Sequence, residues 1–292
     1  MYELVQAGAR TYYVDCPAKM GLYIADGGEA WLIDSGNDKE AGKKVLKLLD
    51  ANGWHLAAVI NTHSNADHIG GNHLLQERTG CPIYTEAQEA SFTRFPMLEP
   101  SFLYGGYPCK ELRNKFLTAQ PSEARELSQD LLPAGIETLA LPGHFFGMFG
   151  VKTPDNVWFL ADCLSGDPIL EKYHIPFIYD VAAYLQTLER VKALSAALFV
   201  PAHAAAVREI APLADRNIAK VREVAERILT LCAEPKGFEE LLAALFGAYG
   251  LTMDFNQYVL VGSTVRSYLS WLHDDGRLHA EFSENRLLWS AV

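Results

Sequence analysis

The stretch Thr62-His63-Ser64-Asn65-Ala66-Asp67-His68 follows directly on the apolar run Ala57-Ala58-Val59-Ile60. The run is typical of a buried strand, so it predicts these polar residues at a strand end. Alternate residues of an extended segment point the same way, which aims His63 and position 65 at one point. Asp67 and His68 open the next helix, where the helix dipole favours a carboxylate. Imidazole and carboxylate groups bind zinc or iron, so this stretch predicts a metal site.

More motifs of the same kind follow other apolar runs: Asp34-Ser35-Gly36, Pro142-Gly143-His144, Ala161-Asp162 and Pro201-Ala202-His203. Polar residues at strand ends gather into functional sites in layered α/β proteins. A metal held there lowers the pKa of bound water to about 7, which provides hydroxide at neutral pH. Any one motif read alone also fits a cap or a turn. Their shared position favours one metal-dependent catalytic site.

The first two hundred residues alternate short apolar runs with amphipathic segments, which predicts an α/β fold. Helices are expected over 38–51, 68–78 and 181–194, and Pro154-Asp155-Asn156 predicts a hairpin. The segment 86–135 is rich in aromatic residues and proline and has no clear period. Because so long a structureless loop is unusual, we expect a lid-like insertion with some helix of its own. A helical excursion packed on the core is the alternative.

After residue 205 the sequence becomes mostly helical, from Pro212 onward. Within it, 258–289 reads as a helix, a turn at Asp274-Asp275-Gly276, and two short strands, an order that suggests a winged-helix-like module. We therefore expect two domains: a metal hydrolase domain over 1–210, including the insertion at 86–135, and a helical, winged-helix-like module over 211–292.

Composition narrows the classes of function. Of 292 residues, 49% are hydrophobic and 21% charged, which excludes a disordered or fibrous chain. No apolar run is long enough for a membrane span, and the start Met1-Tyr2-Glu3-Leu4 lacks signal-peptide character, so a cytoplasmic protein is expected. The net charge of −11 disfavours nucleic acid as a partner. The five cysteines form no C-x-x-C pair, which disfavours a disulfide framework or a cysteine zinc finger.

The motif order Asp-Ser-Gly, His-x-x-x-Asp-His, Pro-Gly-His, Asp and Pro-x-His resembles the metallo-β-lactamase fold hydrolases over about residues 10 to 205. The resemblance implies an αββα sandwich with a two-metal site at one edge of the sheets. It also implies zinc, as one or two ions, with iron or manganese as alternatives. The implied ligands form two sets with a shared residue: His63, position 65 and His144 for site one, Asp67, His68 and His203 for site two, and Asp162 bridging both. Asp34 would support the ligand loop, and Asp67 is also the candidate catalytic residue.

Asn65 departs from the family pattern, which has histidine at that position. An amide is a poorer ligand for a transition metal than imidazole. Site one is therefore expected to be weak, empty, or completed by water or the Asn65 oxygen. The consequence is a one-metal hydrolase, an uneven two-metal hydrolase, or a degenerate member that binds metal without turnover.

The leading hypothesis is a hydrolase acting on a small ester, thioester or lactam-like substrate. A glutathione thioester is less favoured, because residues 162–181 offer only Lys172 for the peptide carboxylates. The rival is a metal-binding regulatory or degenerate protein with a winged-helix-like interaction module. Its candidate recognition helix carries Arg266 but ends in Asp274-Asp275, which favours a dimerisation or lid role, and a homodimer is an expectation on this basis.

Other candidates have ordinary interpretations. Cys163 is expected in the core and Gly70-Gly71 in close helix packing, whereas Tyr173, His174 and Phe177 are candidates to line a pocket. The remaining histidines are expected at the surface: His55, His73, His273 and His279. Of these, His73 is also a candidate to support the site.

Overall fold

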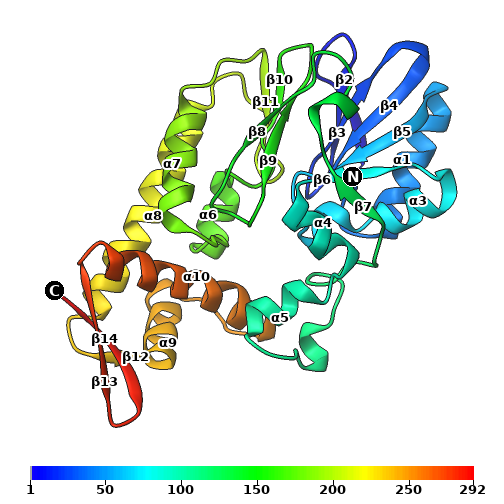
Figure 1. Ribbon diagram of the computed structural model, residues 1–292. Coiled ribbons are helices and arrows are strands. Elements are labelled where there is room, and N and C mark those ends of the chain that lie inside the picture. Colours follow the sequence, from blue (N-terminus) through cyan, green and yellow to red (C-terminus); the bar gives the residue numbers. More distant parts are fainter. Residues whose placement is uncertain (1) are drawn as a thin grey trace.

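The computed structural model describes residues 2–292, so that Met1 lies outside the described residues. Two β-sheets pack face to face, and helices cover the outer face of each (Figure 1). The first sheet has the order β1-β2-β3-β4-β5-β6-β7, and the second has the order β11-β10-β9-β8. The layers therefore run helix, sheet, sheet, helix, as the resemblance to the metallo-β-lactamase fold implies.

The first sheet is antiparallel from β1 to β4 and parallel from β4 to β7. Its strands are β1 (Glu3–Gln6), β2 (Thr11–Asp15), β3 (Met20–Ile24), β4 (Glu29–Ile33), β5 (His55–Ile60), β6 (Ile83–Thr85) and β7 (Ala124–Glu126). Short 3-10 helices occupy Asp26–Gly28, Lys110–Leu112 and Gln129–Leu131. The outer face of the first sheet is covered by α1 (Lys39–Asn52) and α3 (Asn72–Thr79), whose Val45, Leu49 and Leu75 are buried against the strands.

The helix α1 agrees with its predicted bounds: Asp38 caps it, and Gly53 ends it in the left-handed conformation. The helix predicted over 68–78 is interrupted. A short α2 (Ala66–Ile69) precedes α3, because Gly70 and Gly71 lie between them against the Ser35–Asp38 backbone. A Cβ at Gly70 would clash with the Asn37 backbone, so only glycine permits this approach.

The second sheet consists of β8 (Glu137–Ala140), β9 (Phe149–Lys152), β10 (Val157–Phe159) and β11 (Leu198–Val200). The predicted hairpin at 154–156 joins β9 to β10. Between the two sheets lies a core that includes Tyr23, Ile33, Phe149 and Phe159. At Gly21 a side chain would clash with the Phe159 ring at 2.6 Å, so the two sheets are in close contact there.

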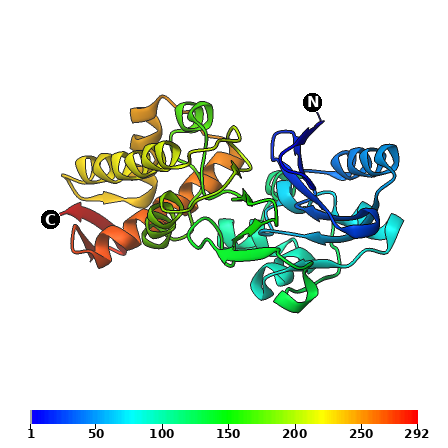
Figure 2. The same ribbon diagram turned by 90° about the horizontal axis from the view of Figure 1, so that it is seen from above.

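The outer face of the second sheet packs on α7 (Val181–Lys192) and α8 (Ala211–Leu231), beside α6 (Asp167–Tyr173). The chain then forms β12 (Lys236–Gly237), α9 (Phe238–Tyr249), α10 (Phe255–Asp274), β13 (Leu278–Ser283) and β14 (Arg286–Ala291). These strands form a third sheet in the order β12-β14-β13. One continuous core joins this C-terminal module to the second sheet, and the module lies on the side away from the first sheet (Figure 2).

The segment 86–135 contains α4 (Ala87–Arg94) and α5 (Leu98–Tyr104), so it has helix of its own as expected. The helix α10 reaches across below the sandwich and contacts α5 (Figure 1).

Candidate metal centre

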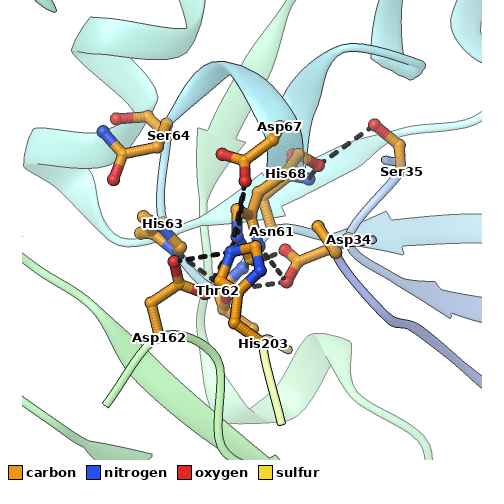
Figure 3. Close-up of polar contacts among 12 residues, drawn as sticks. Asp34, Ser35, Asn61, Thr62, His63, Ser64, Asp67, His68, Asp162 and His203 are labelled. Atoms are coloured by element: carbon orange, nitrogen blue, oxygen red, sulfur yellow. Dashed lines mark hydrogen bonds and ion pairs between the residues drawn. The ribbon is translucent and has the colours of Figure 1, made fainter. Parts of the chain in front are cut away.

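The polar motifs predicted at strand ends meet at one edge of the sandwich. Figure 3 shows the side chains of Asp34, His63, Asp67, His68, Asp162 and His203 gathered there. Asp34 follows β4, His63 follows β5, and Asp162 and His203 follow β10 and β11. Their ligand atoms fall into two groups that share Asp162: His63, His144 and Asp162, and Asp67, His68, Asp162 and His203. Each group has its ligand atoms within 4.8 Å of one another.

The backbone is unusual at two of these strand ends. Asp34 and Ala161 both adopt positive φ angles, 59° and 49°. For a residue with a Cβ this conformation costs about 1–2 kcal/mol, so the surrounding contacts must hold it. Both turns direct the chain into the site, the second one placing Asp162.

The four imidazole rings of these groups are all oriented by a hydrogen bond at Nδ1. Each has its Nδ1 against an oxygen: His68 on Asp34 Oδ2 at 2.8 Å, His144 on the Phe177 carbonyl at 3.0 Å, His203 on the Pro17 carbonyl at 3.0 Å, and His63 on the Thr62 hydroxyl at 3.1 Å. Because the Thr62 hydroxyl itself donates to Asp34 at 2.8 Å, it accepts from His63. A neutral ring that donates from Nδ1 keeps a lone pair on Nε2. All four Nε2 atoms are therefore available as ligands.

Three of the inward-facing atoms lack hydrogen-bond partners. His63 Nε2, His68 Nε2 and Asp162 Oδ1 are buried and unpaired. His68 Nε2 lies 3.0 Å from Asp162 Oδ1, yet the two atoms are not aligned for a hydrogen bond. His203 Nε2 lies 3.1 Å from Asp162 Oδ2 and 3.2 Å from Asp67 Oδ2. Orphaned buried acceptors that converge in this way fit a bound cation.

Electrostatics divides the rings into two pairs. Burial lowers the pKa of His144, and it lowers the pKa of His63 well below its usual value with the help of His68. Burial also disfavours the charged forms of His68 and His203, but the neighbouring carboxylates together outweigh it and raise both pKa values, that of His203 to about 10; Asp162 and Asp67 act on both rings, and Asp34 also acts on His68. Without metal, protons therefore occupy these two rings, and a cation must displace them.

Asn65 enters the first group through its amide. Its Nδ2 donates to Glu99 Oε1 at 2.9 Å, and its Oδ1 lies 3.1 Å from His144 Nε2. Glu99, from α5, is buried, and burial together with Asp67 raises its pKa well above the usual value. The segment 86–135 thus contributes directly to the surroundings of the site.

A second buried carboxylate, Glu89 of α4, joins two site loops. It accepts from the backbone N–H and the hydroxyl of Ser64 at 2.8 and 2.5 Å, and from the backbone N–H of Gly147 at 2.6 Å. Burial raises its pKa to about 7, although these three donors favour the ionised form. Sequence reasoning missed both Glu89 and Glu99, because no pattern marks which acids of an aperiodic segment turn inward.

Aromatic side chains form a wall beside the first group. The Phe177 ring lies 5.4 Å from that of His144, and Phe145 lies 6.4 Å from His63. Phe102 of α5 contacts Phe145 and Phe146, and Phe146 stacks on Tyr179 at 4.3 Å. The segment 86–135 therefore lies on the site side of the sandwich.

The C-terminal module supports the loop that carries Phe177. In α10, the Thr264 hydroxyl accepts from the Ile178 backbone N–H at 3.1 Å, and the Ser267 hydroxyl donates to the Tyr179 carbonyl at 2.7 Å. Because the neighbouring Phe177 carbonyl holds His144, α10 stabilises one of the candidate ligands.

The remaining candidates lie where the sequence places them, with two exceptions. Cys163 is fully buried in the core, whereas His55, His273 and His279 are exposed. His73 is also exposed, and its Nδ1 contacts the Pro121 carbonyl rather than the site. Of the predicted pocket residues, only Phe177 reaches the centre: His174 stacks on Tyr249, and Tyr173 lies under the Lys172 ammonium group.

Within residues 2–292, no helix combines the length and apolar character needed to cross a membrane.

Comparisons with known proteins agree with this geometry. The family model of the metallo-beta-lactamase superfamily matches residues 16–203. A hydroxyacylglutathione hydrolase of Methylococcus capsulatus is 48% identical over 46 residues, 16% of this chain and 18% of that protein. One from Cereibacter sphaeroides is 29% identical over 135 residues, 46% of this chain and 42% of that protein. The chain thus spans less than half the length of these two curated relatives.

Solved structures resemble the whole chain. A metallo-beta-lactamase family protein from Thermus thermophilus has a TM-score of 0.73 at 20% identity, covering 97% of this chain and 99% of that one. A beta-lactamase domain protein from Burkholderia ambifaria has a TM-score of 0.72 at 16% identity, covering 99% and 94%. The likeness in fold therefore extends over the C-terminal module.

Proposed function

Because the chain belongs to the metallo-beta-lactamase superfamily, we propose that it is a metal-dependent hydrolase of a small thioester or ester with an apolar acyl group. The observation that carries this proposal is the common orientation of the four imidazoles, whose Nε2 atoms all face Asp162 and its neighbours. A lactam-like substrate is the alternative within the same chemistry.

The donor atoms fit one or two divalent cations. His63, His144 and Asp162 would hold one, and Asp67, His68, His203 and Asp162 the other. The nitrogen and oxygen donors suit zinc, with iron or manganese as alternatives. When bound, such a cation supplies Lewis acidity for hydrolysis at neutral pH.

The protein side chains have distinct tasks around this centre. Asp34 holds the His68 ring through Nδ1, and the Phe177 carbonyl does the same for His144. The Asp67 side chain is 38% exposed, against 10% for Asp162, so it is the carboxylate open to water. We assign to Asp67 the catalytic role of orienting a water molecule through its carboxylate and accepting a proton there.

The aromatic wall favours an apolar acyl group. A network of aromatic contacts lies beside His63 and His144, in which Phe145 is buried and four side chains are partly exposed: Phe102, Phe146, Phe177 and Tyr179. Such exposed aromatic surfaces exclude water from a bound substrate. The hydroxyacylglutathione hydrolase names of the relatives support thioester cleavage. The Lys172 ammonium group, in the last turn of α6, lies 4.7 Å from the Tyr173 ring, so it contacts that ring rather than the site. A thioester without the glutathione carboxylates is therefore our first choice.

The test is a hydrolysis screen with purified protein. Thiol release from acetyl, benzoyl and lactoyl thioesters is followed beside nitrophenyl esters and a chromogenic lactam. We expect thioester turnover that a chelator abolishes and added zinc or manganese restores. His203→Ala should remove it, whereas His279→Ala, at an exposed position, should not. Failure of the metal-loaded protein on every class would contradict the proposal.

The rival function is a metal-binding regulatory protein in which a winged-helix-like module binds DNA. The order of α8, β12, α9, α10, β13 and β14 is compatible with such a module. However, α10 donates and accepts hydrogen bonds on the site loop, so we propose that the module is a wall of the hydrolase. Salt-dependent binding to mixed-sequence DNA at low salt would instead favour the rival. A homodimer and a cytoplasmic location stay predictions, which solution size measurement and cell fractionation test.

A further inference from the structure

The Asn65 side chain stands at the cap position of α2 but does not cap the helix. Asparagine at this position ordinarily accepts from the first backbone N–H groups. Here the amide turns away from the helix and lies between Glu99 and His144 instead. The Asn65 amide is therefore oriented by side chains of the site and not by the backbone of α2.

The contact between Asn65 and His144 pairs two acceptors. The His144 ring donates from Nδ1 to the Phe177 carbonyl, so its Nε2 carries a lone pair. Asn65 Oδ1 faces that lone pair at 3.1 Å, and Asp162 Oδ2 lies 3.6 Å from the same nitrogen. Neighbouring ligands at about 2.1 Å from one cation lie roughly 3.0–3.4 Å apart, so this pair has the spacing of two ligands of one ion.

Glu99 decides which end of the amide faces the site. Its oxygen accepts from Asn65 Nδ2 at 2.9 Å, which leaves Oδ1 directed at His144. Glu99 is a residue of α5 and its side chain is buried, so the surrounding atoms fix its position. The reversed amide would direct an N–H group at the ion and repel it.

On the basis of the proposed metal centre, we propose that Glu99 is a positioning residue that makes the Asn65 oxygen a ligand of the His63 group. The donor set of that group is then two imidazoles, the Asn65 oxygen and Asp162. The other group also offers two imidazoles and carboxylate oxygens, so the two centres match in donor type. Since Asn65 is neutral where Asp67 is charged, the His63 group binds its cation more weakly.

This donor set also affects which metal binds. Replacing an imidazole by an oxygen lowers affinity for zinc more than for manganese, because manganese favours oxygen ligands. The His63 group should therefore favour zinc over manganese less strongly than a site with a third imidazole at position 65 would. Asn65→His should raise the zinc affinity of this group at least tenfold while changing the manganese affinity little.

The experiment titrates metal-free full-length protein with Mn²⁺, following free Mn²⁺ by electron paramagnetic resonance, and with Zn²⁺ against a chromophoric chelator. Wild type should bind two equivalents, the second more weakly. Glu99→Leu, which has no acceptor for Asn65 Nδ2, should weaken the second equivalent by about 10–100-fold and leave the first unchanged. Glu99→Gln keeps an acceptor oxygen and should retain most of that affinity. Glu111→Leu, at an exposed carboxylate of the same segment, is the matched control and should change neither.

A reciprocal swap separates positioning from general damage to the fold. In Asn65→Asp/Glu99→Gln, the amide at position 99 can donate to the carboxylate at position 65, so an oxygen again faces His144. We expect this double variant to recover the second equivalent. Unchanged second-equivalent affinity in Glu99→Leu, no recovery in the swap, or a single equivalent in wild type would each overturn the inference. Absence of any bound metal would instead contradict the proposed function itself.

Discussion

The Asp34→Asn substitution tests whether ring orientation creates the metal centre. Asp34 accepts from the Thr62 backbone N–H, the Thr62 hydroxyl and His68 Nδ1, each at 2.8 Å. Asparagine tolerates the positive φ angle at this position, so the backbone should stay as it is. It nevertheless places an NH₂ group against His68 Nδ1. The ring must then carry its proton on Nε2, where the lone pair is needed.

The magnitude follows from this change of tautomer. Loss of a residue that orients a metal-bound histidine typically lowers affinity about 10–100-fold, or roughly 1.4–2.7 kcal/mol. The Thr62 hydroxyl, no longer required to donate to Asp34, can donate to His63 Nδ1 and change that ring in the same way. We therefore expect weaker binding of both equivalents, with unfolding free energy lowered by about 1–3 kcal/mol.

The assay is zinc titration of metal-free protein, with nitrogen–proton NMR of the imidazoles to read the tautomer directly. Ser35→Ala is the matched control. It removes hydrogen bonds to the His68 carbonyl and the Gly71 N–H and leaves the His68 ring untouched. Wild-type affinity in Asp34→Asn, or a proton still on His68 Nδ1, would refute the reasoning.

Three further predictions address other parts of the site. His203→Ala should lose about one bound equivalent by elemental analysis, and metal content equal to wild type would remove His203 from the ligand set. The buried Glu89 binds more protons in the folded state, since its pKa is raised from 4.5 to about 7, so it lowers stability as pH rises through that range. Between pH 4.5 and 8, the unfolding free energy of Glu89→Gln should fall by up to about 3 kcal/mol less than that of wild type, as measured by denaturant unfolding. The same dependence of unfolding free energy on pH in both proteins would contradict this. Thr264→Val should leave the Ile178 N–H unpaired, cost about 1–3 kcal/mol and weaken the second metal equivalent, whereas Ser270→Ala on the exposed side of α10 should do neither.

The α/β class was predictable from the alternation of apolar runs and amphipathic segments, and each motif was predictable as a strand end because it follows an apolar run. The layered sandwich, and the grouping of His63, His144, Asp162 and His203 from two different sheets, followed from the resemblance to the family. The helix break at Gly70-Gly71 was not predictable, since it depends on contact with the distant Ser35–Asp38 loop.

Glu89 and Glu99 were not predictable for a related reason. Both are acids within an aperiodic segment, and only tertiary packing decides that they turn inward while Glu111 remains exposed. Likewise, the sequence shows Asn65 as a weak ligand but cannot show that its amide oxygen faces His144. The role of α10 in holding the Phe177 loop also depends on contacts between segments far apart in the chain.

The candidate ligands come from both halves of the sandwich, His63, Asp67 and His68 from the first and His144, Asp162 and His203 from the second. During synthesis the first half emerges with half of a centre, and the pair of groups is complete only after His203 has left the ribosome. A cation that needs ligands from both halves can therefore be held fully only after that point. Once bound, a cation ties the two sheets together, and separating them requires its release. We therefore expect the unfolding rate, more than the folding rate, to depend on metal concentration.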